Sequence, residues 1–526
     1  MQRRRHTTIP SLRAIGIVAA LALTISGCGS SDSPATDDTT AGGIETGAGS
    51  SGGSLVVGVT SDPDTLFPWK ATQFQAVNVV QNLYGTLTEF DQELNVIPGL
   101  AESWEPSKDG LTLTFMLREG VTFADGSSFD SADVAFSLET IQDEATAAVA
   151  ATSLASVTSI DAPDAQTVVL TLSAPDAALP ANLAVINMAM LSSEDTEDAL
   201  NTTPNGTGPF TLESRTPNQS ITLARNDAFW GDAATLDSVE FRVIPDESSI
   251  VSAMQAGNVQ LAVFDDPVVA QTAESANVTV QSTPQLSYHA LQLNAAQGDL
   301  ADVNLRLALQ CAIDRQQVLD TAALGEGEVT GPITSPAYKS DPASRPCPER
   351  DLDKAAEYLE KAGKSDGVTI KTIVSQGEYS TSVNEAQNLK SQAAEAGITL
   401  ELEVLEIGSF VDRWIAADFE AAVALNGGRP DPDGMYGRYF TSDGNLNQVA
   451  GYSSPELDDL FAQGKQSSDP EERKEIYQEV SNNLEDNAAW IWLFTSYTYT
   501  ATASEVQGFT PMPTGSLQYL RTTSIS

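Results

Sequence analysis

The chain has 526 residues and carries 27 basic against 72 acidic side chains, a net charge of −45 at neutral pH. Such a charge repels nucleic acid and anionic lipid headgroups, so neither is expected as a partner. The 473 residues from Ser54 onward are too many for one hydrophobic core, and they predict two or more lobes.

Residues 1–27 have the pattern of a secretory signal peptide. They carry four arginines, no acidic residue, and an apolar run over residues 15–25 that is too short to span a bilayer as a helix. The run ends at Cys28 in the sequence ISGC, which resembles the lipobox of bacterial lipoproteins. Cys28 is therefore predicted to become a diacylated N-terminus, the alternative being an ordinary signal peptide with an incidental cysteine. Removal of the signal leaves a net charge of −49.

Residues 28–53 are rich in Ser, Thr, Gly and Asp and predict a flexible tether. A strand is predicted next, over residues 55–60, followed by the loop of residues 61–69. Loops at the carboxyl ends of strands bind ligands in open α/β sheets, so Leu66 and Trp69 are candidate ligand contacts. Trp69 either faces the ligand or packs inside the fold.

Chemistry-bearing side chains are sparse after the signal peptide. His289 is the one histidine left, and it lies on the apolar face of a predicted strand, which favours a core role. A histidine-based metal site or a Ser/His triad would need a histidine other than this one. We therefore predict no catalytic site, no metal site and no cofactor.

Residues 96–139 carry the most diagnostic pattern. Trp104 leads into an alternating stretch, residues 111–117, that predicts a strand, and a helix capped by Asp130 or Ser131 follows. This segment resembles the signature of family 5 of the extracellular solute-binding proteins of ABC importers, which holds dipeptide, oligopeptide and nickel receptors. The matching residues are Pro98, Leu100, Ala101, Ser103, Trp104, Arg118, Gly120, Val121, Phe123, Asp125, Gly126, Ala132, Asp133, Val134 and Phe136.

A second match begins at residue 287. Residues 287–294 alternate in polarity and predict a strand with one apolar face. A helix follows, and Asp314 with Gln317 predicts the capping box of another. This stretch resembles the family's entry into its second lobe, where the strand is one of two hinge crossings. The matching residues are Asp302, Val303, Arg306, Ala308, Leu309, Ala312, Ile313, Asp314, Arg315 and Val318.

The resemblance implies an α/β fold, a two-lobed clamp like the class II periplasmic binding proteins, with a discontinuous first lobe and an extra α+β insertion. The sequence of lobe II predicts strands over residues 368–375, 398–406 and 419–425, which alternate with helices over residues 383–396 and 410–416. This alternation is typical of a doubly wound sheet. The predicted boundaries are 1–27 for the signal peptide, 28–53 for the tether, 54–91, 208–286 and 501–526 for lobe I, 92–207 for its insertion, and 287–500 for lobe II with hinge strands at both ends.

The loop of residues 426–440 follows the last lobe II strand and resembles the D-P-D loop at the family's cleft. In peptide-binding relatives an Asp ahead of that loop pairs with the ligand's ammonium group, and here Gly428 takes its place. Either Asp431 makes the ammonium contact instead, or Arg429 meets an acidic or hydroxyl group of the ligand. The predicted ligand contacts are Leu66, Trp69, Tyr288, Asn294, Asn426, Gly428, Arg429, Asp431, Asp433, Tyr436, Tyr439 and Trp492.

The predicted function is that of a receptor rather than an enzyme. It is expected to be monomeric, held by lipid alone on the outer face of the cell membrane, and to pass a small solute, a peptide by family, to the subunits of an ABC permease. Alternatives are a sugar oligomer or another non-peptide ligand, a signalling receptor, and a secreted acidic hydrolase. Cys311 and Cys347 are the thiols left in an oxidising compartment, which predicts a disulfide.

Overall fold

The computed structural model describes residues 52–376 and 380–526. The predicted signal peptide and Cys28 lie outside the described residues, as does most of the predicted tether. In the part of the chain that is described, no helix is long and apolar enough to cross a membrane.

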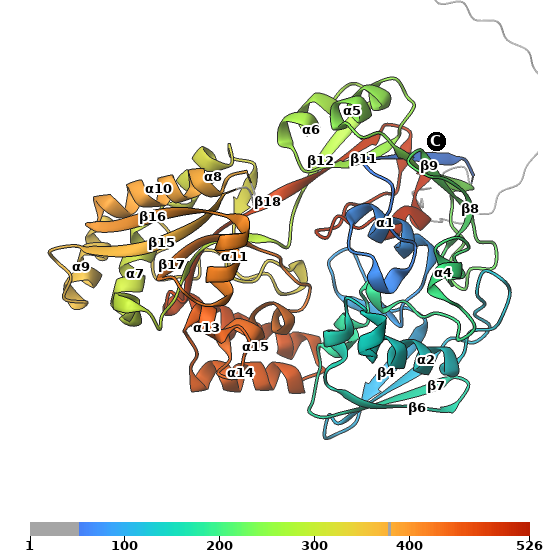
Figure 1. Cartoon of the computed structure of the whole chain (residues 1–526), viewed down its shortest axis with the longest axis horizontal. Helices are drawn as coiled ribbons and strands as arrows, with labels where there is room; N and C mark the ends of the chain where they lie inside the picture. Colours follow the sequence, from blue (N-terminus) through green and yellow to red (C-terminus); the bar gives the residue numbers. More distant parts are fainter. Residues whose placement is uncertain (1–51, 377–379) are drawn as a thin grey trace, which may run out of the picture. The chain divides into compact units, whose positions relative to one another are not determined.

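One mixed sheet runs through both predicted lobes (Figure 1). Within the described residues it has 12 strands, arranged as β16-β15-β17-β13-β18-β11-β1-β10-β9-β8 with β12 and β14 also paired to β18. The strand β18, Trp490–Ala503, makes the sheet continuous between the lobes, because its first half pairs with β13 and its second half with β11 and β12. β18 therefore belongs to both lobes.

The strand β13, Tyr288–Leu293, is buried along its whole length. Only one face was predicted to be apolar and buried, but both faces of β13 are covered; β17 and β18 pair with its two edges. On one side, His289 Nδ1 is 2.9 Å from the Glu385 carboxylate. On the other, the Tyr288 ring lies 5.7 Å from the Tyr436 ring.

Lobe I and its insertion share one hydrophobic core, which includes Phe241 of the large sheet together with Phe115 and Leu138 of the insertion. The insertion carries an antiparallel sheet in the order β4-β5-β7-β6. Asp130 caps its helix α2, as one of the two predicted caps, with its carboxylate accepting from the Ala132 N–H. The bounds are β1 Ser54–Val59, β8 Phe210–Thr216, β9 Ser220–Arg225, β10 Ser238–Val243, β11 Leu261–Phe264, β12 Val278–Pro284, α1 Phe74–Leu83, α5 Glu247–Gln255 and α6 Pro267–Ala273 for lobe I, and β2 Thr88–Phe90, β3 Val96–Pro98, β4 Ala101–Pro106, β5 Thr112–Leu117, β6 Val157–Asp164, β7 Thr167–Leu172, α2 Ser131–Gln142, α3 Leu179–Asn182 and α4 Glu197–Leu200 around the insertion.

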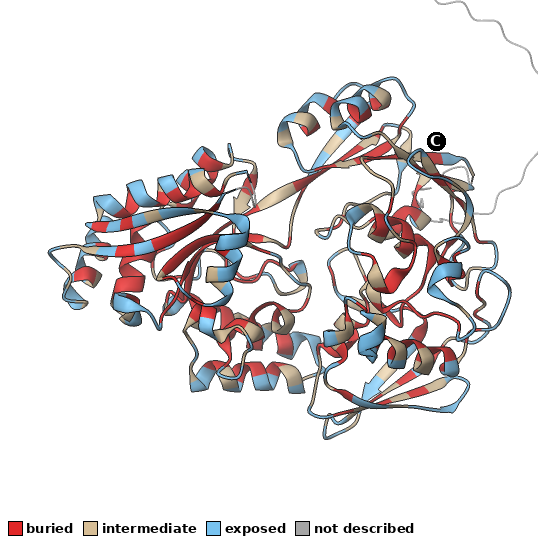
Figure 2. Cartoon of the chain, viewed as in Figure 1, coloured by how far each residue is buried: buried red, intermediate tan, exposed pale blue. Residues whose placement is uncertain are grey.

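Lobe II follows the predicted alternation of strands and helices. β15 pairs in parallel with β16 and β17, whereas β13 and β18 run antiparallel to their neighbours. Figure 2 shows the central strands of lobe II largely buried and the outer faces of its helices exposed. The bounds are β14 Gly327–Val329, β15 Val368–Gln376, β16 Ile398–Glu406, β17 Ala421–Asn426, α7 Val303–Ala312, α8 Arg315–Ala322, α9 Leu352–Lys361, α10 Ser382–Glu395, α11 Ile407–Ile415, α12 Arg438–Phe440, α13 Asn447–Ala450, α14 Pro455–Gln466 and α15 Pro470–Asp486.

A disulfide joins Cys311 of α7 to Cys347, with their Cα atoms 5.0 Å apart. Both cysteines are buried and pack with Ala312 and Ala355. The bond therefore fixes the long segment after α8 to the first helix of lobe II.

Candidate functional site

The loop that follows β17, here called the cleft loop (residues 427–434), borders three cavities of about 250, 260 and 210 Å³. Pro430 lines all three, and each is completed by residues of lobe I or its insertion. We call them the Trp104, Met512 and Arg429 cavities after one residue of each. Their meeting at Pro430 makes the cleft loop the centre of the candidate site.

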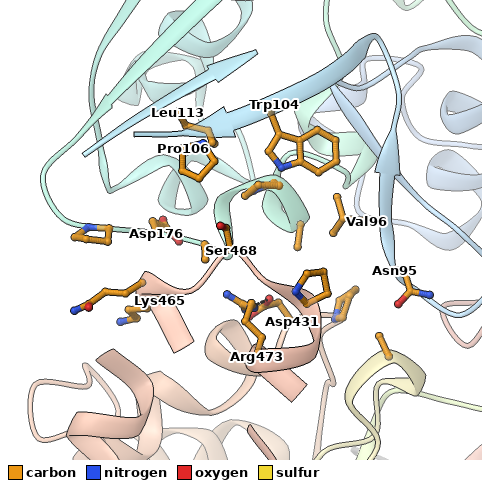
Figure 3. A pocket seen from close by; sticks show the side chains of 18 of the residues that line it. Asn95, Val96, Trp104, Pro106, Leu113, Asp176, Asp431, Lys465, Ser468 and Arg473 are labelled. Carbon is orange, nitrogen blue, oxygen red and sulfur yellow. Dashed lines mark hydrogen bonds and ion pairs between the residues drawn. The ribbon is translucent and has the colours of Figure 1, made fainter. Parts of the chain in front are cut away.

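The Trp104 cavity has a mainly apolar wall, which also carries Asp176, and a charged wall (Figure 3). Leu113 and Trp104 stand on the insertion side, and Asp431, Lys465 and Arg473 stand on the lobe II side. The Ala177 N–H donates to the Lys465 carbonyl at 2.9 Å, which joins the two walls directly.

Within the charged wall, Asp431 and Arg473 form a buried ion pair. Nη2 of Arg473 lies 2.5 Å from Oδ2 of Asp431, and their side chains are only 4% and 8% exposed. Nη1 of Arg473 donates to the Gly464 carbonyl at 2.7 Å. Oδ1 of Asp431 accepts from the Asp433 N–H at 2.9 Å. Both carboxylate oxygens of Asp431 are therefore engaged inside lobe II.

Asp433 is the loop's second carboxyl group. Burial raises its pKa to about 6, against the opposing pull of Lys465. The Lys465 ammonium lies 3.6 Å from Oδ1, which accepts no hydrogen bond from another described residue. With a pKa of about 6, Asp433 is mostly ionised at pH 7 but takes up its proton at a higher pH than an ordinary aspartate does.

The Met512 cavity contains one ion pair and two free donors. Arg521 and Glu89 neutralise each other at 2.8 Å. The Trp230 indole N–H and the Tyr84 hydroxyl make no hydrogen bond within the described residues. Burial and then Asp195 raise the pKa of Tyr84, which keeps its hydroxyl a neutral donor.

Gly428 also lines the Met512 cavity, and its backbone packs closely on lobe I. A Cβ atom built on Gly428 would lie 1.8 Å from the Leu286 carbonyl oxygen. No side chain, acidic or otherwise, fits there without a backbone shift.

The Arg429 cavity is lined on its lobe I side by both apolar and polar residues. Asn182, Thr152 and Ser153 line it, and their side chains make no hydrogen bond to other described residues. Arg429 is exposed as a residue, but partial burial of its side chain, followed by the nearby Arg438, lowers its pKa. The cavity thus combines a guanidinium with amide and hydroxyl groups.

Four of the predicted contacts, Gly428, Arg429, Asp431 and the adjoining Asp433, lie on the cleft loop. Four others are packed in the core of lobe II, where Trp492 Nε1 donates to the Tyr436 hydroxyl at 2.9 Å and Asn426 Nδ2 donates to the Tyr439 hydroxyl at 3.3 Å. None of these core residues lines a cavity of the cleft: Asn426, Tyr436, Tyr439 and Trp492.

The remaining predicted contacts are also packed away from these cavities. Trp69 Nε1 donates to the Ala189 carbonyl at 2.8 Å, so the packing alternative is the one its geometry favours. Leu66 is fully buried in the lobe I core. Tyr288 and Asn294 lie at opposite ends of β13, where Asn294 Nδ2 donates to the Gln448 carbonyl at 3.2 Å. The ligand contacts of these residues stay predictions.

Sequence reasoning missed Trp104 and Arg473 as lining residues. Trp104 stood in a recognised motif but was assigned a structural role, and Arg473 lies in α15, far along the chain. His289 stacks on Phe494 at 4.2 Å, and its Nε2 is 3.0 Å from the Ser496 hydroxyl, in agreement with a core histidine. Among the described residues, no group of three or more His, Cys, Asp or Glu could hold a metal ion.

Comparison with known proteins now assigns the family. The model of the bacterial extracellular solute-binding proteins, family 5 (middle region), matches residues 95–447. The chain belongs to this family. The family-5 assignment confirms the prediction of a solute-binding receptor acting outside the cytoplasm.

Known proteins match this chain along almost its whole length. The glutathione-binding protein GsiB of Escherichia coli (strain K12) is 27% identical over 485 residues, 87% of this chain and 92% of that protein. The structure of HbpA2 from Haemophilus parasuis superposes with a TM-score of 0.82 at 25% identity, over 90% of this chain and 100% of that one. DppA of Helicobacter pylori, an ABC transporter-associated periplasmic binding protein in complex with the peptide STSA, gives 0.67 at 26% identity, over 90% and 98%. The predicted two-lobed fold class is confirmed.

Proposed function

We propose that this family-5 receptor captures a peptide-sized solute in the cleft around Pro430 and delivers it unchanged to an ABC permease. The observation that carries the proposal is the meeting of three cavities, each lined from both lobes, at one loop. Relatives that are named for glutathione or hold a peptide support a peptide as the ligand class.

Binding would work through contacts to both lobes. A ligand that touches both stabilises the closed arrangement over the open one by its differential affinity. The chain passes between the lobes in the short segment from Pro284 to Tyr288 and in the middle of β18, so rotation needs dihedral changes at few residues. The permease would then recognise the closed receptor.

The free donors of the cleft suit a peptide backbone. Tyr84 and Trp230 line the Met512 cavity, and the Tyr84 hydroxyl and the Trp230 indole N–H are buried donors with no partner among the described residues. Unpaired buried donors cost free energy that a ligand carbonyl recovers on binding. Both donor atoms are buried in this arrangement, so we expect ligand oxygens to accept from them only when the surrounding side chains shift on binding.

Attachment to the membrane would depend on Cys28 alone, as a lipid-modified N-terminus after signal cleavage. We expect the exported wild-type chain to partition into the detergent phase, and the Cys28→Ser chain to stay in the aqueous phase. Aqueous partitioning of both chains would contradict the anchor.

A thermal-shift screen of the mature chain against peptides, glutathione and oligosaccharides tests the function. A ligand at a hundred times its dissociation constant stabilises the folded state by about 2.7 kcal/mol, which is easily measured. Mass spectrometry of the recovered ligand should show it intact, because the proposed role is binding. Turnover would favour a hydrolase, and an unchanged radius of gyration at saturation would contradict closure.

A further inference from the structure

We infer that residues 326–347, here called the hinge brace, contact both chain crossings between the lobes, and that the Cys311–Cys347 disulfide acts through this brace on ligand binding. The disulfide then has a conformational role besides its effect on stability. The inference deepens the proposed function and rests on it, because it concerns how the lobes are held around a ligand.

The brace begins on the second crossing, in the middle of β18. Its strand β14 pairs with residues 494–496 of β18, and a Cβ atom built on Gly327 would lie 2.4 Å from the Thr495 carbonyl oxygen, so the two backbones are in close contact. One residue earlier, Oε2 of Glu326 accepts from the Tyr499 hydroxyl at 2.6 Å. Tyr499 pairs with β11 and β12 of lobe I, so this hydrogen bond joins lobe II to lobe I.

The middle of the brace contacts the first crossing. The Thr334 hydroxyl donates to the Leu286 carbonyl at 2.5 Å, and the Leu286 side chain packs with Met512 of lobe I. Two residues before Thr334, the Pro332 carbonyl accepts from the hydroxyl of Tyr436 in the lobe II core. Rotation of the lobes has to move these groups relative to one another, so the brace resists it.

The far end of the brace is fixed inside lobe II. Nη2 of Arg345 donates to the Thr330 carbonyl at 3.0 Å and lies 3.2 Å from Oε1 of Glu485 in α15, with both charged side chains at most 1% exposed. Two residues further on, Cys347 is bonded to Cys311 of α7. A buried ion pair stabilises only in good geometry. The disulfide therefore keeps Arg345 on Glu485 and holds the brace in place.

Reduction removes this fixation. A dithiol gives two electrons and two protons to the disulfide, so that the S–S bond breaks, two S–H bonds form and the dithiol closes to its own disulfide. A loosened hinge has more arrangements of the lobes, which a ligand must then order, so affinity should fall by about 5- to 10-fold. Because coupling is reciprocal, bound ligand should make the disulfide harder to reduce by the same factor, a potential lower by about 20–30 mV.

Two measurements on the mature chain test the inference. Hydrogen exchange without ligand should be faster at residues 285–288 and 494–496 in the reduced protein than in the oxidised one. The binding probe is a pooled library of two- to five-residue peptides that contain no cysteine. It measures the affinity of both redox forms and, in dithiothreitol redox buffers, the potential of the disulfide with and without the library.

Two variants test the brace while the disulfide stays intact. Thr334→Val and Tyr499→Phe each remove one hydroxyl contact with a crossing, and each should lower affinity by about 2- to 10-fold. Thr321→Val is the matched control, because Thr321 lies on α8 outside the brace and its hydroxyl donates to the Gln317 carbonyl of the same helix. The control should bind as wild type does.

Equal affinity of the two redox forms would overturn the inference and leave the proposed function intact. A loss of affinity on reduction without a loss in either brace variant would also overturn it, since the disulfide would then act by another route. If reduction unfolds the chain, the two variants decide alone. A library that does not bind the oxidised wild type would remove the proposed function, and the inference with it.

Discussion

Replacing Asp433 by Asn should make the protein more stable, and increasingly so as the pH rises. Burial raises the pKa of Asp433 from 3.8 to about 6, so the folded state favours the protonated carboxyl group. Stability from that protonated group is fully present below pH 3.8 and is lost as the pH rises through 6. The isosteric amide never ionises and avoids this loss.

The magnitude follows from the shift. Linkage over about two pKa units gives the Asn variant an advantage of about 1.6 kcal/mol at pH 5 and about 3 kcal/mol at pH 8, as upper values. Both pH values lie above the sequence pI of about 4.1, where the protein stays charged. The Asp433 side chain is only 17% exposed, so solvent screens little of the effect.

Denaturant unfolding of wild type and Asp433→Asn at the two pH values measures this difference. Asp366→Asn is the matched control, because Asp366 is exposed and should show no difference at either pH. An Asn advantage that is the same at pH 5 and pH 8, or a less stable Asn variant at pH 8, would refute the assignment of the buried charge.

Three further changes test the contacts that hold the cleft loop and lobe II in place. Arg473→Met should cost about 3–5 kcal/mol in urea unfolding, because it leaves a buried carboxylate unpaired; a loss below about 1 kcal/mol would show that the pair is solvated. Gly428→Ala should lower ligand affinity and the melting temperature together, since the new Cβ would lie 1.8 Å from the Leu286 carbonyl; unchanged values would show that the loop shifts freely. Reduction of the Cys311–Cys347 bond, which spans 36 residues, should cost up to about 4 kcal/mol, and thiol titration of the unfolded, unreduced protein should find neither cysteine free.

Most of the fold was predictable because its signals are local. The helix α10 and the strands β15 and β16 begin and end within a residue or two of their predicted bounds, since their apolar periodicity and flanking glycines lie within a few residues. The start of α11 at Ile407 was missed by three residues. Burial of β13 on both faces was missed for a different reason: it depends on which elements cover the strand, and α10 is nearly a hundred residues away.

The candidate site was predictable in place but less so in composition. The glycines and charged residues after β17 marked the cleft loop, and the loop does border all three cavities. Aromatic residues on the same stretch looked like ligand contacts, yet Tyr436 and Tyr439 are core residues. A helical turn directs them inward, because residues 433–437 coil in a π-helical turn rather than extending as a loop.

The sequence does not show which charged side chains of the cleft are unpaired. Asp431 is 42 residues from Arg473, and Glu89 is 432 residues from Arg521, so no pattern within one segment reveals either pair. These pairs make the two acids of the cleft loop look unlike ligand contacts. Asp431 holds the loop to α15, and Asp433, whose pKa burial raises to about 6, lies beside Lys465. A loop fixed in this way from inside lobe II costs little ordering entropy when a ligand arrives. The same fixation leaves Arg429 as the loop's one unneutralised charge, so a receptor with a strong net negative charge presents a cation at the centre of its cleft.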